Sequence, residues 1–313
     1  MRFSATYSVL LIIAVFVSVA IGQGDNFPVL QGPYLGYKPP GETPVKFPFD
    51  FLPEGYRLHS APAFTPDGEE VYFSAMDFSV RFSEKIFVMR MSGGTWGLPE
   101  VAPFSGDFFD GSPSIAGDGS CLFFSSARTR DQKKRSETGK RNIWFVKRGG
   151  DGWSAPEPLG FQTPEWQNGS DLSDEGNLYF DSKDIYRLAF DESTQSDPVK
   201  LGKAINSEHT ELHPCIAPDE RFLIFYSSRP GHFGESGGDL YISFKNEDGD
   251  WRPAVNMGET FNKGHLSTSF PRLSPDGEYL FFLKLVSVPW KAEVYWVSTK
   301  ALLAEEFYKQ GEK

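Results

Sequence analysis

Apolar and polar residues alternate over short runs along most of this chain, and acidic, glycine-containing turns join the runs in pairs. The stretch SPDGEYLFF at 274–282 combines such a turn with the aromatic and aliphatic residues of a buried strand. A tight hairpin needs positive φ at its centre, which Gly adopts freely and Asp tolerates. The unit occurs five times, about 50 residues apart, as APAFTPDGEEVYFS, SPSIAGDGSCLFFS, GSDLSDEGNLYFD, HPCIAPDERFLIFYS and FPRLSPDGEYLFFL. The turn position falls at Gly68, Gly119, Gly176, Glu220 and Gly277.

Each copy continues with further short strands. A third strand follows a loop of variable length, as KIFVMRM, NIWFVKR, DIYRLAF, DLYISFK and EVYWVST. A proline-marked fourth strand follows in the first four copies, as TWGLPEVAPF, GWSAPEPLGF, SDPVKLG and DWRPAVNMG. We call the four strands of a unit A to D. Four-stranded antiparallel sheets repeated at this period are typical of a β-propeller.

The number of strands predicts how the ring closes. Five sets of strands A to C are present, but the last set has no fourth strand after it. The segment ETPVKFPFDF at 42–51 resembles the other fourth strands and removes a free sheet edge if it pairs with the last blade. We therefore predict an all-β, five-bladed propeller closed by an N-terminal strand. A six-bladed ring needs another set, and VLQGPYLGYKPPG is too short to supply it.

These repeats also resemble a known family. SPDGEYLFF, APDERFLIFYSSRPG with GGDLYIS, and GDGSCLFFSSAR with RNIWFV are similar to the WD40-like repeat of TolB-type propellers. The resemblance covers residues 42–300 and implies the propeller fold. It implies little about function, because such scaffolds carry unrelated activities.

The N-terminus has the features of an export signal. Arg2 precedes an apolar run from Val9 to Ile21, and Ala20-Ile21-Gly22 fits a cleavage site. The run is shorter than the roughly 20 residues of a spanning helix, which favours a signal peptide over an anchor. We expect a signal peptide at 1–22, an extension at 23–41, a single propeller at 42–300 and a tail at 301–313. The protein is then periplasmic or secreted, with no membrane span after signal removal.

The composition of the chain limits the classes of partner that it can bind and predicts the state of its cysteines. The formal net charge of −11 argues against broad nucleic-acid binding. The two cysteines, Cys121 and Cys215, fall at non-equivalent positions of non-adjacent repeats, so we expect two separate buried thiols.

One enzymatic alternative stays open. RGGDGWSAPEP and NEDGDWRPAV partly resemble the Asp-box of sialidases. In that family Asp, Gly and Trp are separated, whereas Asp151, Gly152 and Trp153 are contiguous. A glycosidase also needs two facing carboxylates about 5–10 Å apart. No catalytic residue is predicted, and a sialidase-like glycoside hydrolase is the second hypothesis.

Alignment of the innermost strands predicts a polar ring at one mouth of the central channel. The equivalent positions at the strand start are all polar, whereas a second equivalent row is uniformly apolar and is predicted to lie between blades. Convergent polar groups suit ligand binding, although a wet channel mouth is also polar without a ligand. The polar row is His59, Asp110, Gln167, Glu211 and Thr268, with His213 two positions further along its strand. The apolar row is Phe64, Ile115, Leu172, Ile216 and Leu273.

The stretch EHTELHP contains a possible metal ligand set. In an extended strand His209, Glu211 and His213 point the same way, and two imidazoles with a carboxylate can hold zinc, with His59 or Asp110 as a fourth ligand. Structural zinc sites usually have tighter Cys/His signatures, so an ordinary polar strand end is the preferred interpretation. No metal or cofactor is predicted.

The loop SARTRDQKKRSETGKRN is basic within an acidic protein. We expect it either to bind an anionic glycan, lipid headgroup or acidic partner, or to be a solvated mobile loop. Its basic residues are Arg128, Arg130, Lys133, Lys134, Arg135, Lys140 and Arg141, against Asp131 and Glu137.

Taken together, these patterns favour an exported, monomeric, non-enzymatic propeller that binds a protein or glycan partner in the cell envelope. A purely structural envelope component is the third hypothesis.

Overall fold

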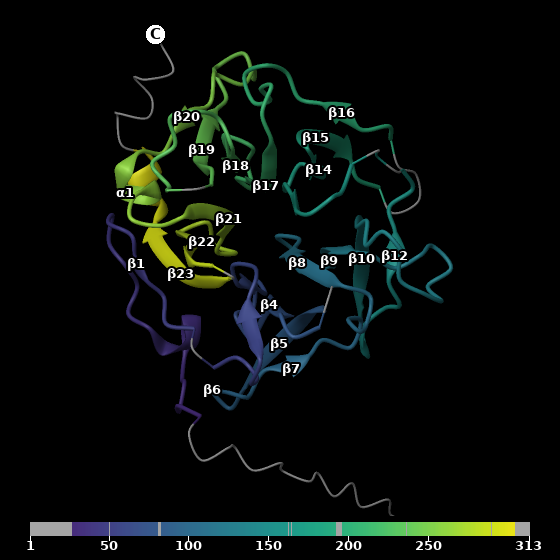
Figure 1. Ribbon diagram of the computed structural model, residues 1–313. Helices are drawn as coiled ribbons and strands as arrows, with labels where there is room; N and C mark the ends of the chain where they lie inside the picture. The colour runs from purple at the N-terminus through teal and green to yellow at the C-terminus, as the bar shows by residue number, and fades with distance from the viewer. Residues whose placement is uncertain are drawn as a thin grey trace, which may run out of the picture.

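The computed structural model describes residues 27–303, apart from 50, 81–82, 162, 164, 192–195, 236 and 289. The predicted signal peptide and most of the predicted tail therefore lie outside the described residues. Five small antiparallel sheets surround a central axis, with β8, β17 and β21 among the strands nearest the centre (Figure 1). The predicted five-bladed propeller is confirmed.

The blades follow one another in chain order. Blade 1 contains β2 (Tyr56–Leu58), β3 (Ala63–Phe64), β4 (Glu70–Asp77), β5 (Glu84–Ser92), β6 (Thr95–Trp96) and β7 (Glu100–Val101). Blade 2 contains β8 (Asp110–Ile115), β9 (Cys121–Ser126), β10 (Asn142–Gly149), β11 (Gly152–Trp153) and β12 (Glu157–Pro158). Blade 3 contains β13 (Ser170–Leu172), β14 (Asn177–Ser182), β15 (Asp184–Ala189) and β16 (Val199–Lys200). Blade 4 contains β17 (Glu211–Ile216), β18 (Phe222–Ser227), β19 (Asp239–Phe244) and β20 (Val255–Asn256).

Blade 5 is completed by the N-terminal strand. It contains β21 (Ser267–Leu273), β22 (Tyr279–Ser287) and β23 (Lys291–Ser298), and β1 (Val45–Lys46) pairs with β23 so that Val45 lies opposite Trp296. Figure 1 shows the purple β1 beside the yellow β23. Phe47 follows β1, is fully buried, and has Phe281 and Trp296 ring centroids at 5.3 and 5.0 Å. The predicted closure by the N-terminal strand is confirmed.

The turns between strands A and B have a common geometry. Gly68, Gly119, Gly176 and Gly277 have φ between 70° and 75°. Glu220 adopts φ 57° at the same position, in the left-handed region that disfavours side chains. Its carboxylate accepts hydrogen bonds from Ser173 and Asn177 of blade 3, each at 2.8 Å. These contacts link two blades and explain why a non-glycine residue is stable there.

Five apolar clusters fill the spaces between neighbouring blades. Each member of the predicted apolar row contributes to a different cluster, so the prediction that this row packs between blades is confirmed. Cys121 and Cys215 are buried in two of these clusters and are not joined by a disulfide, as expected.

The segment before β1 covers the outer side of blade 1. Leu30 and Leu35 are buried against it, and the Trp96 indole donates a hydrogen bond to the Gly32 carbonyl at 2.8 Å. Three short helices complete the described chain: η1 (Pro33–Gly36), α1 (Glu259–Asn262) and η2 (Thr299–Leu303). Within the described part of the chain, no helix has the length and apolar character needed to cross a membrane.

Candidate binding face at the channel mouth

The inner strands begin at the end of the propeller where the B–C loops lie. The described residues of these loops are 78–80, 83, 127–141, 228–235, 237–238, 288 and 290, and we call this end the loop face. The cross-strand pairs Asp110–Ser126 and Glu211–Ser227 place the start of strand A beside the end of strand B. The predicted polar row therefore lies next to these loops.

Asp110 of that row is locked into a buried ion pair. Both of its carboxylate oxygens lie 2.9 Å from Arg128 Nη2, and the two side chains are 0% and 2% exposed. The same guanidinium nitrogen donates to the Phe104 carbonyl at 3.1 Å, and the Gly106 amide donates to Asp110 at 3.0 Å. Burial raises the pKa of Asp110 despite the opposing charge of Arg128. The pair thus clamps the loop that enters blade 2.

Glu211 forms the equivalent clamp in blade 4. It accepts hydrogen bonds from the Ser207 and Ser227 hydroxyls at 2.6 and 3.0 Å and lies 3.4 Å from Arg229 Nε. Arg229 also donates to the Ile205 carbonyl. The recurring Ser-x-Arg at the ends of FFSSAR and FYSSR is the sequence signal that could have revealed both clamps.

The remaining members of the row differ in their roles. Gln167 is buried, and its Oε1 accepts a hydrogen bond from the Ile143 amide at 2.7 Å, as Asn206 does from Ile185 and Asn262 from Leu240. Thr268 is buried, and its hydroxyl has no hydrogen-bond partner among the described residues. Of the predicted row, only His59 reaches partial exposure.

His59 belongs to a network that continues from blade to blade. Its Nδ1 lies 2.7 Å from Glu84 Oε1, and Glu84 Oε2 lies 2.7 Å from Arg141 Nη1. Arg141 Nη2 then donates to Asn168 Oδ1 at 3.0 Å. Burial alone would raise the pKa of Glu84, but the charges of His59 and Arg141 outweigh burial and hold it below its usual value.

The network then crosses blades 3, 4 and 5. The amide of Asn168 donates to Asp181 Oδ1 at 2.8 Å, and the amide of His213 donates to Asp181 Oδ2 at 2.8 Å. The His213 ring stacks on Phe270 with centroids 3.7 Å apart. Phe270 lies 5.6 Å from the His59 ring, which closes a ring of contacts through all five blades. We call it the mouth ring: His59, Glu84, Arg141, Asn168, Asp181, His213 and Phe270.

The backbone adopts a left-handed conformation at two residues of the mouth ring. His213 and Phe270, together with Ser112 in blade 2, each have φ 52° at an irregularity in strand A. Blade 3 has Gly169 at this position, where a Cβ would lie 3.1 Å from the His213 Cα. Positive φ at bulky residues costs energy and clusters at functional sites.

The ionisation states in the mouth ring follow from burial. Burial raises the pKa of Asp181 to about 6, although it accepts amide hydrogen bonds. Burial, with the nearby positive charges, holds the pKa of His213 well below its usual value, so this ring is neutral at pH 7. His213 Nδ1 and Arg141 Nε have no hydrogen-bond partner among the described residues, which leaves two polar atoms for water or a ligand.

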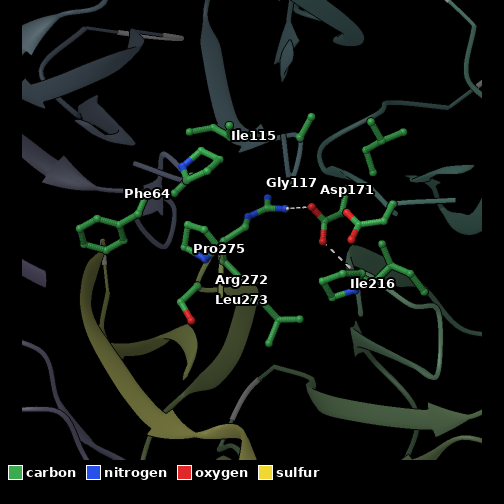
Figure 2. A pocket seen from close by; sticks show the side chains of 15 residues that line it. Phe64, Ile115, Gly117, Asp171, Ile216, Arg272, Leu273 and Pro275 are labelled. Atoms are coloured by element: carbon green, nitrogen blue, oxygen red, sulfur yellow. Dashed lines mark hydrogen bonds and ion pairs between the residues drawn. The ribbon is translucent and has the colours of Figure 1, made fainter. Parts of the chain in front are cut away.

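An ion pair crosses the other end of the channel. Arg272 of blade 5 reaches Asp171 of blade 3, with Nη1 3.2 Å from Oδ1 (Figure 2). Arg272 also donates to the Ser170 carbonyl at 3.0 Å. Asp171 also accepts the Ile216 amide at 3.0 Å. The cavity around this pair is about 50 Å³, which is space for a few waters.

Exposed apolar side chains gather on the loop face. They lie in three B–C loops, at the end of β22 and in the segment that leads into blade 3. They are Phe78, Val80, Trp166, Phe233, Val286 and Val288, exposed by 36–75%. Scattered exposed apolar residues are ordinary, but several on one face indicate a contact surface.

The predicted basic loop needs a correction. Arg128 and Arg141 are buried in ion pairs with Asp110 and Glu84, so they add nothing to an exposed positive surface. Arg130, Lys133 and Lys134 are exposed, whereas Arg135 and Lys140 are partly buried. The loop sequence gives no sign that Arg128 and Arg141 are buried, because Asp110 and Glu84 lie 18 and 57 residues away.

The possible zinc ligands are not brought together. His209 is exposed, Glu211 is bound within its clamp, and His213 faces the mouth ring. Among the described residues, no three His, Cys, Asp or Glu side chains form a group that could hold a metal ion.

Comparisons with known proteins show the fold. No family model and no curated protein matches the chain, so membership of the WD40-like repeat family stays a prediction. TolB from Acinetobacter baumannii is similar over 80% of this chain and 54% of its own, with 16% identity and a TM-score of 0.51. This chain thus spans about half of that TolB. A thermostable family-43 glycoside hydrolase is similar over 79% of this chain and 90% of its own, with 11% identity and a TM-score of 0.52. At such identities the similarity shows the fold alone, and function depends on the site.

Proposed function

We propose that this chain is a non-enzymatic binding propeller of the cell envelope that holds a protein partner on its loop face. The observation that carries the proposal is the set of exposed apolar side chains around the mouth ring. Aromatic residues at the centre of a contact surface contribute most of the binding energy in protein interfaces. Trp166 and Phe233, exposed by 38% and 39%, are the expected anchors.

The carboxylates of the channel support binding rather than hydrolysis. Glu84 and Asp110 are each held by a guanidinium group, and Glu211 is held by Arg229 and two serines. Asp181 is fully buried and accepts two backbone amides. A glycosidase needs an acid and a base that reach a bond from opposite sides. These four carboxylates are instead occupied in holding loops and strands.

The experiment compares two faces of the same protein. The mature chain carrying Trp166→Ser and Phe233→Ser is used to capture partners from an envelope extract, beside the native chain. A control carries Val101→Ser and Val199→Ser, which remove exposed apolar side chains from the D strands of blades 1 and 3. We expect a stoichiometric protein to be recovered by the native and control chains and lost from the loop-face variant.

Two results would overturn the proposal. One is capture that survives the loop-face changes but is lost in the control. The other is hydrolysis of a neutral or anionic glycan that disappears in a folded Asp181→Asn variant, which would favour the glycoside hydrolase hypothesis. Localisation is tested separately by the N-terminal residue of the exported chain, predicted to be Gln23.

A further inference from the structure

A second cavity, distinct from the channel, lies in blade 2. Its volume is about 280 Å³. The basic B–C loop covers it, strand β10 forms its wall, and the segment after β12 closes its side. The lining residues are Arg128, Thr129, Arg130, Ser136, Thr138, Lys140, Asn142, Trp144, Pro158, Leu159 and Phe161.

The charge of this cavity is positive. Of the described residues that line it, three are basic and none is a carboxylate. Asp110 balances Arg128 from outside the cavity. Arg130 contacts the carbonyl oxygens of Leu159 and Gly160 at 3.3 and 3.4 Å, and no carboxylate among the described residues pairs with it. A carbonyl leaves a guanidinium charge uncompensated, so an anion is favoured here even though the whole protein is acidic.

Buried polar atoms without partners add a second, independent indication. Trp144 is 1% exposed, yet its indole nitrogen has no hydrogen-bond partner among the described residues. The Asn142 side-chain oxygen, also buried, has none either. A buried donor without an acceptor costs free energy, and a ligand oxygen at this place would satisfy it. An indole N–H only donates, so it fits an anion and not a cation.

The rest of the lining suits a hydroxylated ring. The Thr129 hydroxyl bonds to Asp131 and the Lys134 carbonyl, and the Ser136 and Thr138 hydroxyls lie 3.0 Å from each other. Their remaining lone pairs can accept from sugar hydroxyls, and Pro158 and Phe161 supply an apolar surface. We propose that this cavity binds an anionic sugar unit, a uronic acid or a sugar phosphate. Arg130 and the Trp144 indole donate to the anionic group, and the lining hydroxyls and Asn142 Oδ1 accept from the hydroxyl groups of the sugar. This cavity lies beneath one loop of the loop face, but neither proposed anchor of the protein partner, Trp166 or Phe233, lines it, so sugar binding and protein capture can be tested independently.

Isothermal titration calorimetry on the full mature chain tests the proposal, with glucuronate, glucose 6-phosphate, glucose and inorganic phosphate as probes. We expect an anionic probe to bind, and glucose to bind at least tenfold more weakly. Arg130→Gln removes a charge-assisted contact and should weaken binding of that probe about tenfold or more. Lys133→Gln is the matched control, since it removes an exposed charge of the same loop outside the cavity lining and should leave the affinity within about twofold.

Trp144→Phe separates the indole hydrogen bond from the packing of the ring. It should also weaken binding, and a urea unfolding curve checks that the variant is folded. Binding of glucuronate alone identifies a carboxylate ligand, and binding of glucose 6-phosphate alone identifies a phosphate ligand. Three results would overturn the proposal: equal binding of glucose, inorganic phosphate binding as tightly as glucose 6-phosphate, or equal losses in Arg130→Gln and Lys133→Gln.

Discussion

Replacing Arg128 by Met tests whether the predicted ligand residue Asp110 is in fact a structural group. The substitution keeps an apolar stem beneath Phe108 and Phe124 but leaves a 0%-exposed carboxylate without its cation. Removing one partner of a buried pair costs about 3–5 kcal/mol of unfolding free energy. In the equivalent clamp Arg229 is 17% exposed, so water can reach the Glu211 carboxylate once Arg229 is replaced. Arg229→Met should therefore lower the unfolding free energy by less, about 1–3 kcal/mol.

The unfolding free energy lost in Arg128→Met should depend on pH in a defined direction. Burial already raises the pKa of Asp110, and loss of Arg128 should raise this pKa further. A carboxyl whose folded pKa is raised contributes stability that is full below its unfolded pKa and lost as pH rises through its folded pKa. The cost of Arg128→Met should therefore shrink between pH 7 and pH 5. In the double variant with Asp110→Asn no buried charge remains, and roughly 2 kcal/mol should be recovered.

Urea unfolding followed by tryptophan fluorescence measures these free energies at both pH values. The clamp reasoning fails if Arg128→Met costs less than about 1 kcal/mol at pH 7, or if the two substitutions simply add. It also fails if the cost grows as pH falls.

Three further predictions concern closure, the mouth ring and its titration. Phe47→Ala should lower the unfolding free energy by about 3–5 kcal/mol in urea, because it opens a cavity where the first and last blades meet; a loss below about 1 kcal/mol would contradict the importance of this closure. Gly111→Ala should destabilise by about 1–3 kcal/mol, because its Cβ would collide with the Glu84 carboxylate. Gly150→Ala, with open space around the new Cβ, should be nearly neutral, and equal effects would refute the collision. NMR should find one carboxyl titrating near pH 6, absent in Asp181→Asn, because burial raises the pKa of Asp181 to about 6; stability from this group is full below about pH 4 and is lost as pH rises through 6.

The blade count and the ring closure were predictable because they rest on local patterns. Acidic-glycine turns define four of the five A–B hairpins, and the alternation of Phe64 and its equivalents defines which side packs between blades. The closing strand was predictable because residues 42–51 on their own resemble the D strands of the other blades. Such patterns repeat with each blade, so five copies reinforce one another.

The mouth ring could not be predicted in the same way. Glu84 and Arg141 lie beside loops of unequal length, and their meeting depends on how two blades pack. The left-handed backbone at His213 and Phe270 brings two rings to 3.7 Å, and alternation along a regular strand gives no hint of it. The clamps were missed for a different reason: Asp110 and Glu211 are bound by Arg128 and Arg229, and these pairs become visible only with strand pairing.

The pairing of β1 with β23 also sets an order of assembly. Lys46 and Glu293, which form a 3.0 Å ion pair across this junction, are 247 residues apart in sequence. The entropy lost on joining distant segments grows only with the logarithm of their separation, so the junction is thermodynamically inexpensive. It is nevertheless slow to form, because the earliest segment must await the latest hairpin. Until the junction forms, Phe47 lacks its aromatic partners Phe281 and Trp296. A nascent chain at that stage exposes apolar surface that a chaperone or protease can recognise.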